Sequence, residues 1–117
     1  MPGLSIHVVD VSRGVVARGM RVEVLRTGPG PLLLADATVD ASGVLAAPVL
    51  MGPEIVRGRY EVRFHVADYY RSQAVPVPGE PFLDVVSYAF GIDDPMQHYH
   101  LPMKTTPWGY SCFRGGA

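Results

Sequence analysis

Glycine and proline residues interrupt this chain at short intervals and leave no room for long regular elements. The sequence holds 13 glycines and 11 prolines among 117 residues, and they follow no repeat. Both residue types break helices and central strands, so a chain with this many breaks favours short strands over helices. A chain of this length also has room for only one hydrophobic core. We therefore predict a single β-rich domain over residues 1–117.

The stretches between the breaks alternate between apolar and polar residues. The clearest is 59–66, where every second residue is apolar: Tyr60, Val62, Phe64 and Val66. Successive side chains of a strand point to opposite faces, so this pattern predicts a strand with one buried face. Comparable stretches predict strands over 4–11, 20–26, 32–39, 44–49, 82–92, 98–104 and 108–114. Their spacing is typical of a β-sandwich, and one helix is expected over 68–74, beginning at Asp68.

The composition excludes several classes of protein. The net charge is −1, which gives no electrostatic reason to expect a nucleic acid or a membrane surface as partner. The single cysteine, Cys112, cannot form an internal disulfide, and in its apolar stretch we expect an inert thiol. There is no signal-peptide pattern, no apolar run of the ~20 residues in a membrane helix, and no cofactor-binding motif. These features predict a cytoplasmic protein without a cofactor.

Three of the four histidines lie on expected strands near the two ends of the chain. His98 and His100 are separated by one residue, so their side chains leave the same face of a strand, about 7 Å apart. His7 projects from the face of the first strand opposite its apolar residues. Three interpretations are open from spacing alone: hydrogen-bonded structural side chains, a general base that activates water, or a zinc site. For His65, and for the aromatic residues Trp108 and Tyr110, we expect structural roles.

Blocks of sequence along nearly the whole chain resemble one known family. The most specific blocks are His98-Tyr99-His100-Leu101-Pro102 and Trp108-Gly109-Tyr110-Ser111-Cys112-Phe113-Arg114-Gly115, preceded by Leu4-Ser5-Ile6-His7-Val8-Val9-Asp10 and Gly58-Arg59-Tyr60-Glu61-Val62-Arg63-Phe64. They are similar to the transthyretin-like family, whose enzymatic members are 5-hydroxyisourate hydrolases. The resemblance implies an eight-stranded sandwich with one short helix. It also implies a homotetramer, a dimer of dimers with active sites in the clefts between the dimers.

The resemblance assigns roles to individual residues. His7 and His100 match the two catalytic histidines of the family, and His98 lies beside them. The family's arginine belongs to an Asp-Gly-Arg turn that here is Ser42-Gly43-Val44, so Val44 takes the place of a cation. The substrate-binding residues implied by the resemblance are Val44, Ser111, Phe113 and Arg114. No metal site is implied.

These matches predict a small-molecule enzyme in which a histidine assists the hydrolysis or rearrangement of a cyclic amide or related heterocycle. Valine cannot make the charge-assisted hydrogen bonds by which an arginine holds an acidic ring. Hydroxyisourate is therefore one candidate substrate, and a neutral or alkylated purine-derived ring, or an intermediate of specialised metabolism, agrees better with Val44. The alternative is a non-catalytic protein that binds a small ligand.

Overall fold

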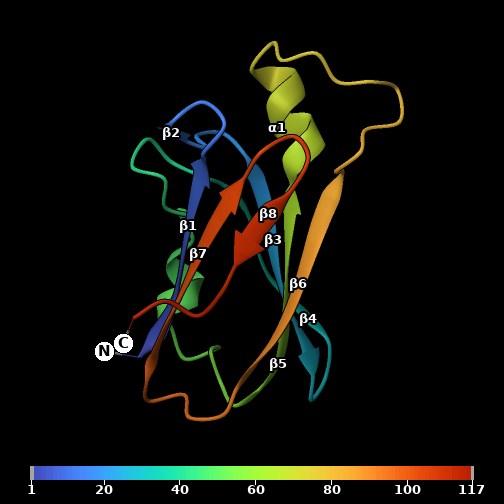
Figure 1. Cartoon of the computed structure of the whole chain (residues 1–117). Coiled ribbons are helices and arrows are strands. Elements are labelled where there is room, and N and C mark those ends of the chain that lie inside the picture. Colours follow the sequence, from blue (N-terminus) through green and yellow to red (C-terminus); the bar gives the residue numbers. More distant parts are fainter. Residues whose placement is uncertain (1, 117) are drawn as a thin grey trace.

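Two sheets of four strands face each other in the computed structural model, which describes residues 2–116 (Figure 1). One sheet has the strand order β2-β1-β7-β8 and the other the order β4-β3-β5-β6. The strands are β1 (Gly3–Asp10), β2 (Val15–Val16), β3 (Arg21–Gly28), β4 (Leu32–Thr38), β5 (Gly58–His65), β6 (Val85–Ile92), β7 (His98–Thr105) and β8 (Tyr110–Cys112). The helix α1 (Val66–Ser72) directly follows β5, and a short 3₁₀ helix, η1 (Pro48–Met51), lies between β4 and β5. The expected all-β sandwich with one short α-helix is confirmed.

The core lies between the two sheets and is built from the alternating apolar positions. Six of these side chains, from β1 and β5, are at most 1% exposed: Leu4, Ile6, Val8, Tyr60, Val62 and Phe64. Burying an apolar side chain of this size stabilises the fold by about 1.5–3 kcal/mol. The buried positions thereby determine which face of each strand points outwards.

The first and the last parts of the chain meet in the centre of one sheet. β1 and β7 pair in parallel, with Ser5 opposite His100 and Gly3 opposite His98. A shift of this register by one residue would move every side chain of one strand to the other face of the sheet. Because Leu4 and Leu101 are both buried, such a shift would expose core residues. The register therefore decides which residues from the two ends of the chain share the outer face.

The expected edge strand over 44–49 is wrong. Val44 and Leu45 form only isolated bridges, to His7 and Val39, and η1 begins at Pro48. Proline has no N–H for a sheet, and its fixed φ suits the first turn of a helix. The eighth strand is instead β2, a two-residue strand that pairs with the end of β1.

Several other element boundaries also differ from the sequence-based expectation. α1 begins at Val66 rather than Asp68, because the backbone N–H of Val66 donates to the carbonyl of Asp84 and fixes the start by a tertiary contact. β6 begins at Val85 rather than at 82, after a segment rich in prolines that lack the N–H a strand needs. β8 covers only Tyr110–Cys112 of the expected 108–114.

A buried carboxylate joins the end of β1 to α1. Asp10 is fully buried, and its oxygens accept hydrogen bonds from the hydroxyls of Ser12 at 2.6 Å, Tyr70 at 2.8 Å and Tyr69 at 3.1 Å. The pKa of Tyr69 is raised to about 12, first by burial and then by the charge of Asp10, so this hydroxyl remains a donor. The hydroxyl of Tyr70 also lies 3.3 Å from the carbonyl oxygen of Thr105 at the end of β7. The network therefore holds the ends of β1 and β7 against the helix.

We predict that Asp10→Ala lowers the free energy of unfolding by about 3 kcal/mol, because it leaves the Tyr69 hydroxyl without its acceptor and the Tyr70 hydroxyl with only the longer contact to the Thr105 carbonyl, at about 1–3 kcal/mol for each lost bond. Urea unfolding followed by circular dichroism measures the loss. Asp36→Ala is the matched control, since Asp36 pairs with Arg21 at the surface, where an ion pair contributes little. Equal losses for the two variants would contradict a structural role for the buried network.

Candidate functional site

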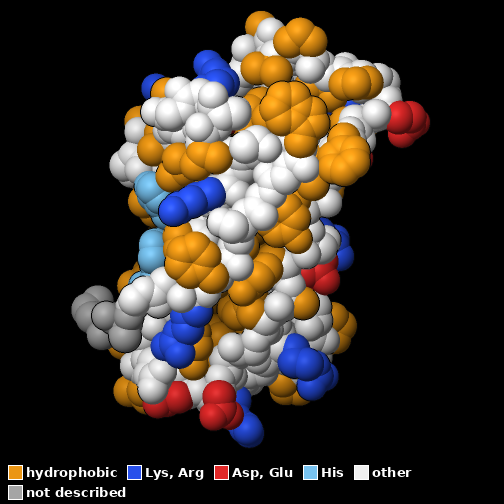
Figure 2. Space-filling view, in the orientation of Figure 1, with side chains coloured by type: hydrophobic (Ala, Val, Ile, Leu, Met, Phe, Trp, Pro, Cys, Tyr) orange, Lys and Arg blue, Asp and Glu red, His pale blue; other side chains and the backbone are white. Residues whose placement is uncertain are grey.

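The outer face of the β2-β1-β7-β8 sheet collects the polar residues from both ends of the chain. Ser5 and His7 leave this face from β1, and His98 and His100 leave it from β7, each of them half-buried. Their neighbours in sequence point into the core, as the alternation predicted. Figure 2 shows histidine side chains at the left margin of the molecule, beside exposed hydrophobic side chains.

Ser5 links the two histidines of β7. Its Oγ is 2.8 Å from Nε2 of His98 and 2.7 Å from Nδ1 of His100. The register places Ser5 directly opposite His100, so the hydroxyl lies between the two rings. Both imidazoles are thereby held in fixed orientations by one side chain.

His7 is held by the turn that precedes Val44. Its Nε2–H donates to the carbonyl of Ser42 at 3.2 Å, which leaves Nδ1 without a proton in the neutral ring. Gly43 has a φ of +87° and lies so close that a Cβ there would be 2.7 Å from Nε2 of His7. Asp40 fixes the turn by accepting hydrogen bonds from the Ser42 hydroxyl and from two backbone N–H groups, and these donors hold its pKa below the ordinary value.

Val44 lies beside His7 on the same face. The two residues form an antiparallel bridge, and residues paired in this way project their side chains to the same side. Val44 is 37% exposed, so its isopropyl group is open to a bound molecule. An apolar surface therefore borders His7 at this point.

The C-terminal segment continues alongside β7 beyond β8. The N–H of Gly115 donates to the carbonyl of His100 at 2.7 Å, in the same register that pairs Ser111 with Lys104. We call the outer face that carries His7, His98 and His100 the histidine face. Alternation along the segment places Ser111 and Phe113 on the histidine face and Arg114 on the opposite face. A Cβ at Gly115 would lie 2.9 Å from Cδ2 of His100, so the segment covers one edge of this ring.

Arg114 is engaged away from the histidine rings. Its guanidinium donates to the side chain of Gln97 at 2.9 Å and lies 4.1 Å from the centroid of the Tyr99 ring. Tyr99 is buried on the core side of β7. The structure thus brings together His7, His98, His100 and Val44, but it does not bring the Arg114 guanidinium to them.

The electrostatics of the face keep His100 neutral. Burial lowers the pKa of His100, and the neighbouring His7 and His98 lower it further when they are charged. A neutral imidazole can accept a proton from water, which is what a general base requires.

A model of the HIUase/transthyretin family matches residues 4–115, almost the entire chain. The chain belongs to this family. Its transthyretin-like fold and the resemblance drawn from the sequence are confirmed.

Relatives and solved structures of the family match over nearly the full chain. The 5-hydroxyisourate hydrolase of Deinococcus radiodurans is 42% identical over 97% of this chain and 96% of its own length. The structure of Klebsiella pneumoniae 5-hydroxyisourate hydrolase has a TM-score of 0.81 at 27% identity and covers 99% of this chain and 100% of that one. A structure of (S)-allantoin synthase has a TM-score of 0.91 at 35% identity over 97% of this chain, which spans only 43% of that longer chain.

Two residues of the histidine face were not found from the sequence. Ser5 stands two residues before His7, and Lys104 stands four residues after His100 on the same side of β7. The period of two groups Ser5 with His7 on β1, and Lys104 with His98 and His100 on β7. At a rise of about 3.3 Å per residue, the cationic residue Lys104 lies about 13 Å along β7 from His100.

The remaining sequence-based expectations concern Trp108, Tyr110, Cys112 and His65. Trp108 and Tyr110, expected to have structural roles, are 70% and 47% exposed in the single chain. The loop and the strand edge that carry them do not turn these rings inwards. Burial raises the pKa of the Cys112 thiol to about 11, which keeps it protonated and unreactive at neutral pH. His65 lies on the other sheet, with Nε2 2.6 Å from Glu23.

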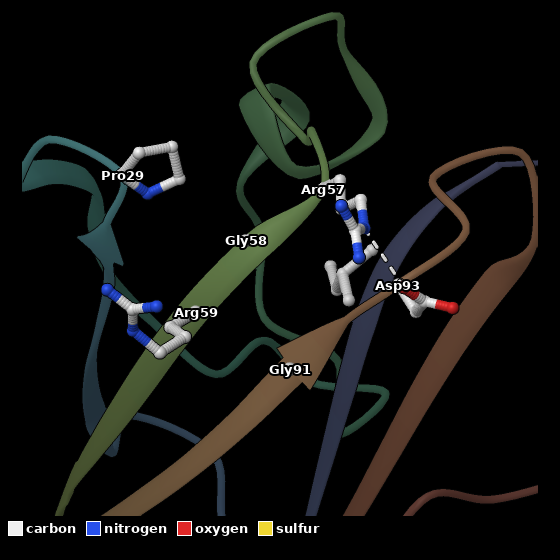
Figure 3. Close-up of a pocket in the computed structure, with 7 residues that line it drawn as sticks. Pro29, Arg57, Gly58, Arg59, Gly91 and Asp93 are labelled. Carbon is white, nitrogen blue, oxygen red and sulfur yellow. Dashed lines mark hydrogen bonds and ion pairs between the residues drawn. The ribbon is translucent and has the colours of Figure 1, made fainter.

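Two pockets lie away from the histidine face. One, of about 590 Å³, is open at the ends of β5 and β6, where Arg57 pairs with Asp93 and Arg59 lies beside Pro29 (Figure 3). The other, of about 370 Å³, is apolar and lies between α1 and the exposed side chains of Phe82 and Trp108.

Within residues 2–116 no group of three or more His, Cys, Asp or Glu side chains is arranged to hold a metal ion. None of the helices described is long and apolar enough to cross a membrane.

We predict that Gly43→Ala disturbs His7, whereas Gly19→Ala does not. Gly43 and Gly19 have φ values of +87° and +89°, so both variants carry the left-handed strain of about 1–2 kcal/mol. Only the new Cβ at Gly43 would meet His7, because nothing lies within 4 Å of a Cβ at Gly19. Gly43→Ala should lose more stability in urea unfolding and shift the NMR signals of the His7 ring. Identical behaviour of the two variants would contradict the close packing of the turn on His7.

Proposed function

We propose that the protein hydrolyses a cyclic amide of the hydroxyisourate type, with His7 and His100 as the acid–base pair. The observation that carries this proposal is the array of His7, His98 and His100 on one outer face, with ring orientations set by Ser5 and by the Ser42 carbonyl. The relatives named 5-hydroxyisourate hydrolase support the same reaction class. Such an array has the nitrogen atoms that proton transfer needs and needs no cofactor.

The proposed reaction is an addition of water followed by ring opening. An unprotonated imidazole nitrogen removes a proton from water while the water oxygen attacks a ring carbonyl carbon. The tetrahedral centre then collapses, the ring C–N bond breaks, and the departing nitrogen receives a proton from an imidazole N–H. Nδ1 of His7 and Nε2 of His100 make no hydrogen bond within residues 2–116, so each is open to water or to the departing nitrogen.

We propose that the preferred ring is neutral or alkylated rather than anionic. In the family an arginine occupies the position of Val44, where it would hold an acidic ring by charge-assisted hydrogen bonds. Here that position offers an exposed isopropyl group beside His7. The guanidinium of Arg114 is already engaged by Gln97 and the Tyr99 ring. Both observations support a ring that carries no negative charge at this edge.

We further propose that a homotetramer is the functional unit. The residues of the histidine face are only half-buried, and exposed apolar side chains such as Phe113 lie on the same face. A second copy placed over this face would exclude water from the ring carbonyl and close the pocket. Light scattering of the purified chain tests the assembly, and full activity in a verified monomer would contradict it.

We predict that the purified protein accelerates the decay of hydroxyisourate measurably and that His100→Ala and His7→Ala each reduce this acceleration by about 100-fold or more, the usual contribution of general acid–base catalysis. Ultraviolet absorbance of freshly generated hydroxyisourate follows the reaction. His65→Ala is the matched control, because His65 lies on the other sheet. Unchanged rates in both site variants would favour the non-catalytic, ligand-binding alternative.

We predict that Val44→Arg raises kcat/KM for hydroxyisourate by roughly 10- to 100-fold, because a charge-assisted hydrogen bond contributes about 1.5–3 kcal/mol. Val56→Arg adds the same charge at another exposed valine and should leave kcat/KM unchanged. A wild-type enzyme that already matches its relatives on hydroxyisourate, with no gain in Val44→Arg, would overturn the proposed preference for a neutral ring.

A further inference from the structure

One hydroxyl proton lies between two imidazole rings on the histidine face. The Oγ of Ser5 is within hydrogen-bond distance of Nε2 of His98 and of Nδ1 of His100. A serine hydroxyl has one proton to donate, and each nitrogen of a neutral imidazole either donates or accepts. Ser5 can therefore donate to only one of the two rings, and it accepts from the other ring or from both. The protonation of one ring is tied to that of its neighbour.

Two arrangements satisfy both hydrogen bonds and place the Ser5 proton between the rings, whereas in a third both ring N–H groups donate to Oγ. In the first, Nδ1–H of His100 donates to Ser5 and Ser5 donates to Nε2 of His98, so Nε2 of His100 is unprotonated. In the second, Nε2–H of His98 donates to Ser5 and Ser5 donates to Nδ1 of His100, so a neutral His100 carries its proton on Nε2. The first arrangement makes Nε2 of His100 a base, and the second makes it a proton donor.

We propose that Ser5 is a positioning residue that couples His98 and His100 into one proton-sharing unit, in which His98 stores the proton that His100 takes from water. This rests on the proposed function and assigns His98 a part in the same reaction. It gives both proton transfers to His100, and the unprotonated Nδ1 of His7 then serves to accept a hydrogen bond from the attacking water. No hydrogen bond within residues 2–116 occupies Nε2 of His100, which leaves that atom free for water or a leaving group. The Gly115 segment covers the Cδ2 edge of the ring and limits its rotation.

The proton transfers balance over the full cycle. Water gives a proton to Nε2 of His100, the Nδ1 proton passes to Oγ of Ser5, and the Ser5 proton passes to Nε2 of His98. The positive charge then resides on His98, and His100 is neutral with its proton on Nε2. When the ring C–N bond breaks, Nε2–H of His100 protonates the departing nitrogen, and the reverse transfers return the stored proton from His98. Both rings end in their starting states.

The surroundings disfavour a positive charge on His100. Burial lowers the pKa of His100, and the charges of His7 and His98 lower it further, so this ring is a poor place to hold an added proton. Among the other titratable or charged groups on the surrounding elements, His7 and Lys104 lie on the same face as the pair, and Asp40 lies in the turn under His7. Asp10, Tyr99, Tyr110, Cys112 and Arg114 belong to the alternate positions of β1, β7, β8 and the C-terminal segment. Arg114 binds the backbone carbonyl of His98 at 3.4 Å rather than its ring.

The kinetic test compares Ser5→Ala, Ser5→Thr and His98→Gln. Ser5→Ala should lower kcat by about 10- to 100-fold with little change in KM, and should move the acid limb of the pH profile to lower pH, because it removes the hydrogen bonds that stabilise the shared proton. Ser5→Thr keeps the hydroxyl and should retain activity. Ser87→Ala is the matched control, as Ser87 is exposed on the other sheet.

A double variant distinguishes coupling from simple packing. If His98 acts through Ser5, then Ser5→Ala combined with His98→Gln should cost no more than either change alone, since both interrupt the same path. Additive losses, or a Ser5→Ala enzyme with unchanged kcat and pH profile, would overturn the proposal. Circular dichroism of each variant verifies the fold.

A second measurement needs no substrate and separates this inference from the proposed function. Long-range ¹H–¹⁵N NMR spectra of the free protein report which ring nitrogens carry protons. In the wild type the rings of His98 and His100 should titrate as a coupled pair, and in Ser5→Ala they should titrate independently, with His65 unaffected in both. Independent titration in the wild type would overturn the coupling even if hydroxyisourate is hydrolysed. Coupled titration in a protein that fails to hydrolyse hydroxyisourate would support the coupling while rejecting the proposed function.

Discussion

The parallel pairing of β1 with β7 is the constraint on which the rest of the site depends. It places Ser5 opposite His100 although the two residues are 95 positions apart in the sequence. The buried faces of both strands fix this register, because a slip of one residue would exchange core side chains for histidines. Core packing, rather than any contact among the histidines, therefore determines that one serine hydroxyl lies between two imidazole rings.

The β1–β7 pair also connects the buried hydrogen-bond network at Asp10 with the candidate site. Asp10 and Thr105 are paired at one end of the two strands, where the buried carboxylate and the tyrosines of α1 hold the pair against the helix. Ser5 and His100 lie on the outer face closer to the other end. A strand held at its buried end has little freedom to rotate, so the hydroxyl of Ser5 remains within hydrogen-bond distance of both rings.

The sequence predicts those features that depend on local periodicity. The alternation in 59–66 gave the buried face of β5 correctly, and the spacing of His98 and His100 gave their common face. It could not give the pairing of β1 with β7, and therefore missed Ser5, because pairing over such a separation leaves no local pattern. The error at 44–49 arose similarly, since apolar residues with one proline fit an edge strand or a 3₁₀ turn equally well. The side of the segment to which the Arg114 side chain points depends on the register of the C-terminal segment against β7. The sequence alone did not determine that register.

In the proposed mechanism, proton transfer and charge recognition reside on separate parts of this fold. The histidine rings are oriented by Ser5 and by a backbone carbonyl of the turn, whereas residue 44 contributes only its side chain to the same face. The turn itself is held by the Asp40 carboxylate, whose partners are the Ser42 hydroxyl and backbone N–H groups, and by the positive φ of Gly43. None of these interactions involves the side chain at position 44. That side chain can therefore change from a cation to an isopropyl group with the turn and the hydrogen bonds of the histidines intact. In this architecture the substrate's charge can be selected independently of the groups that move protons.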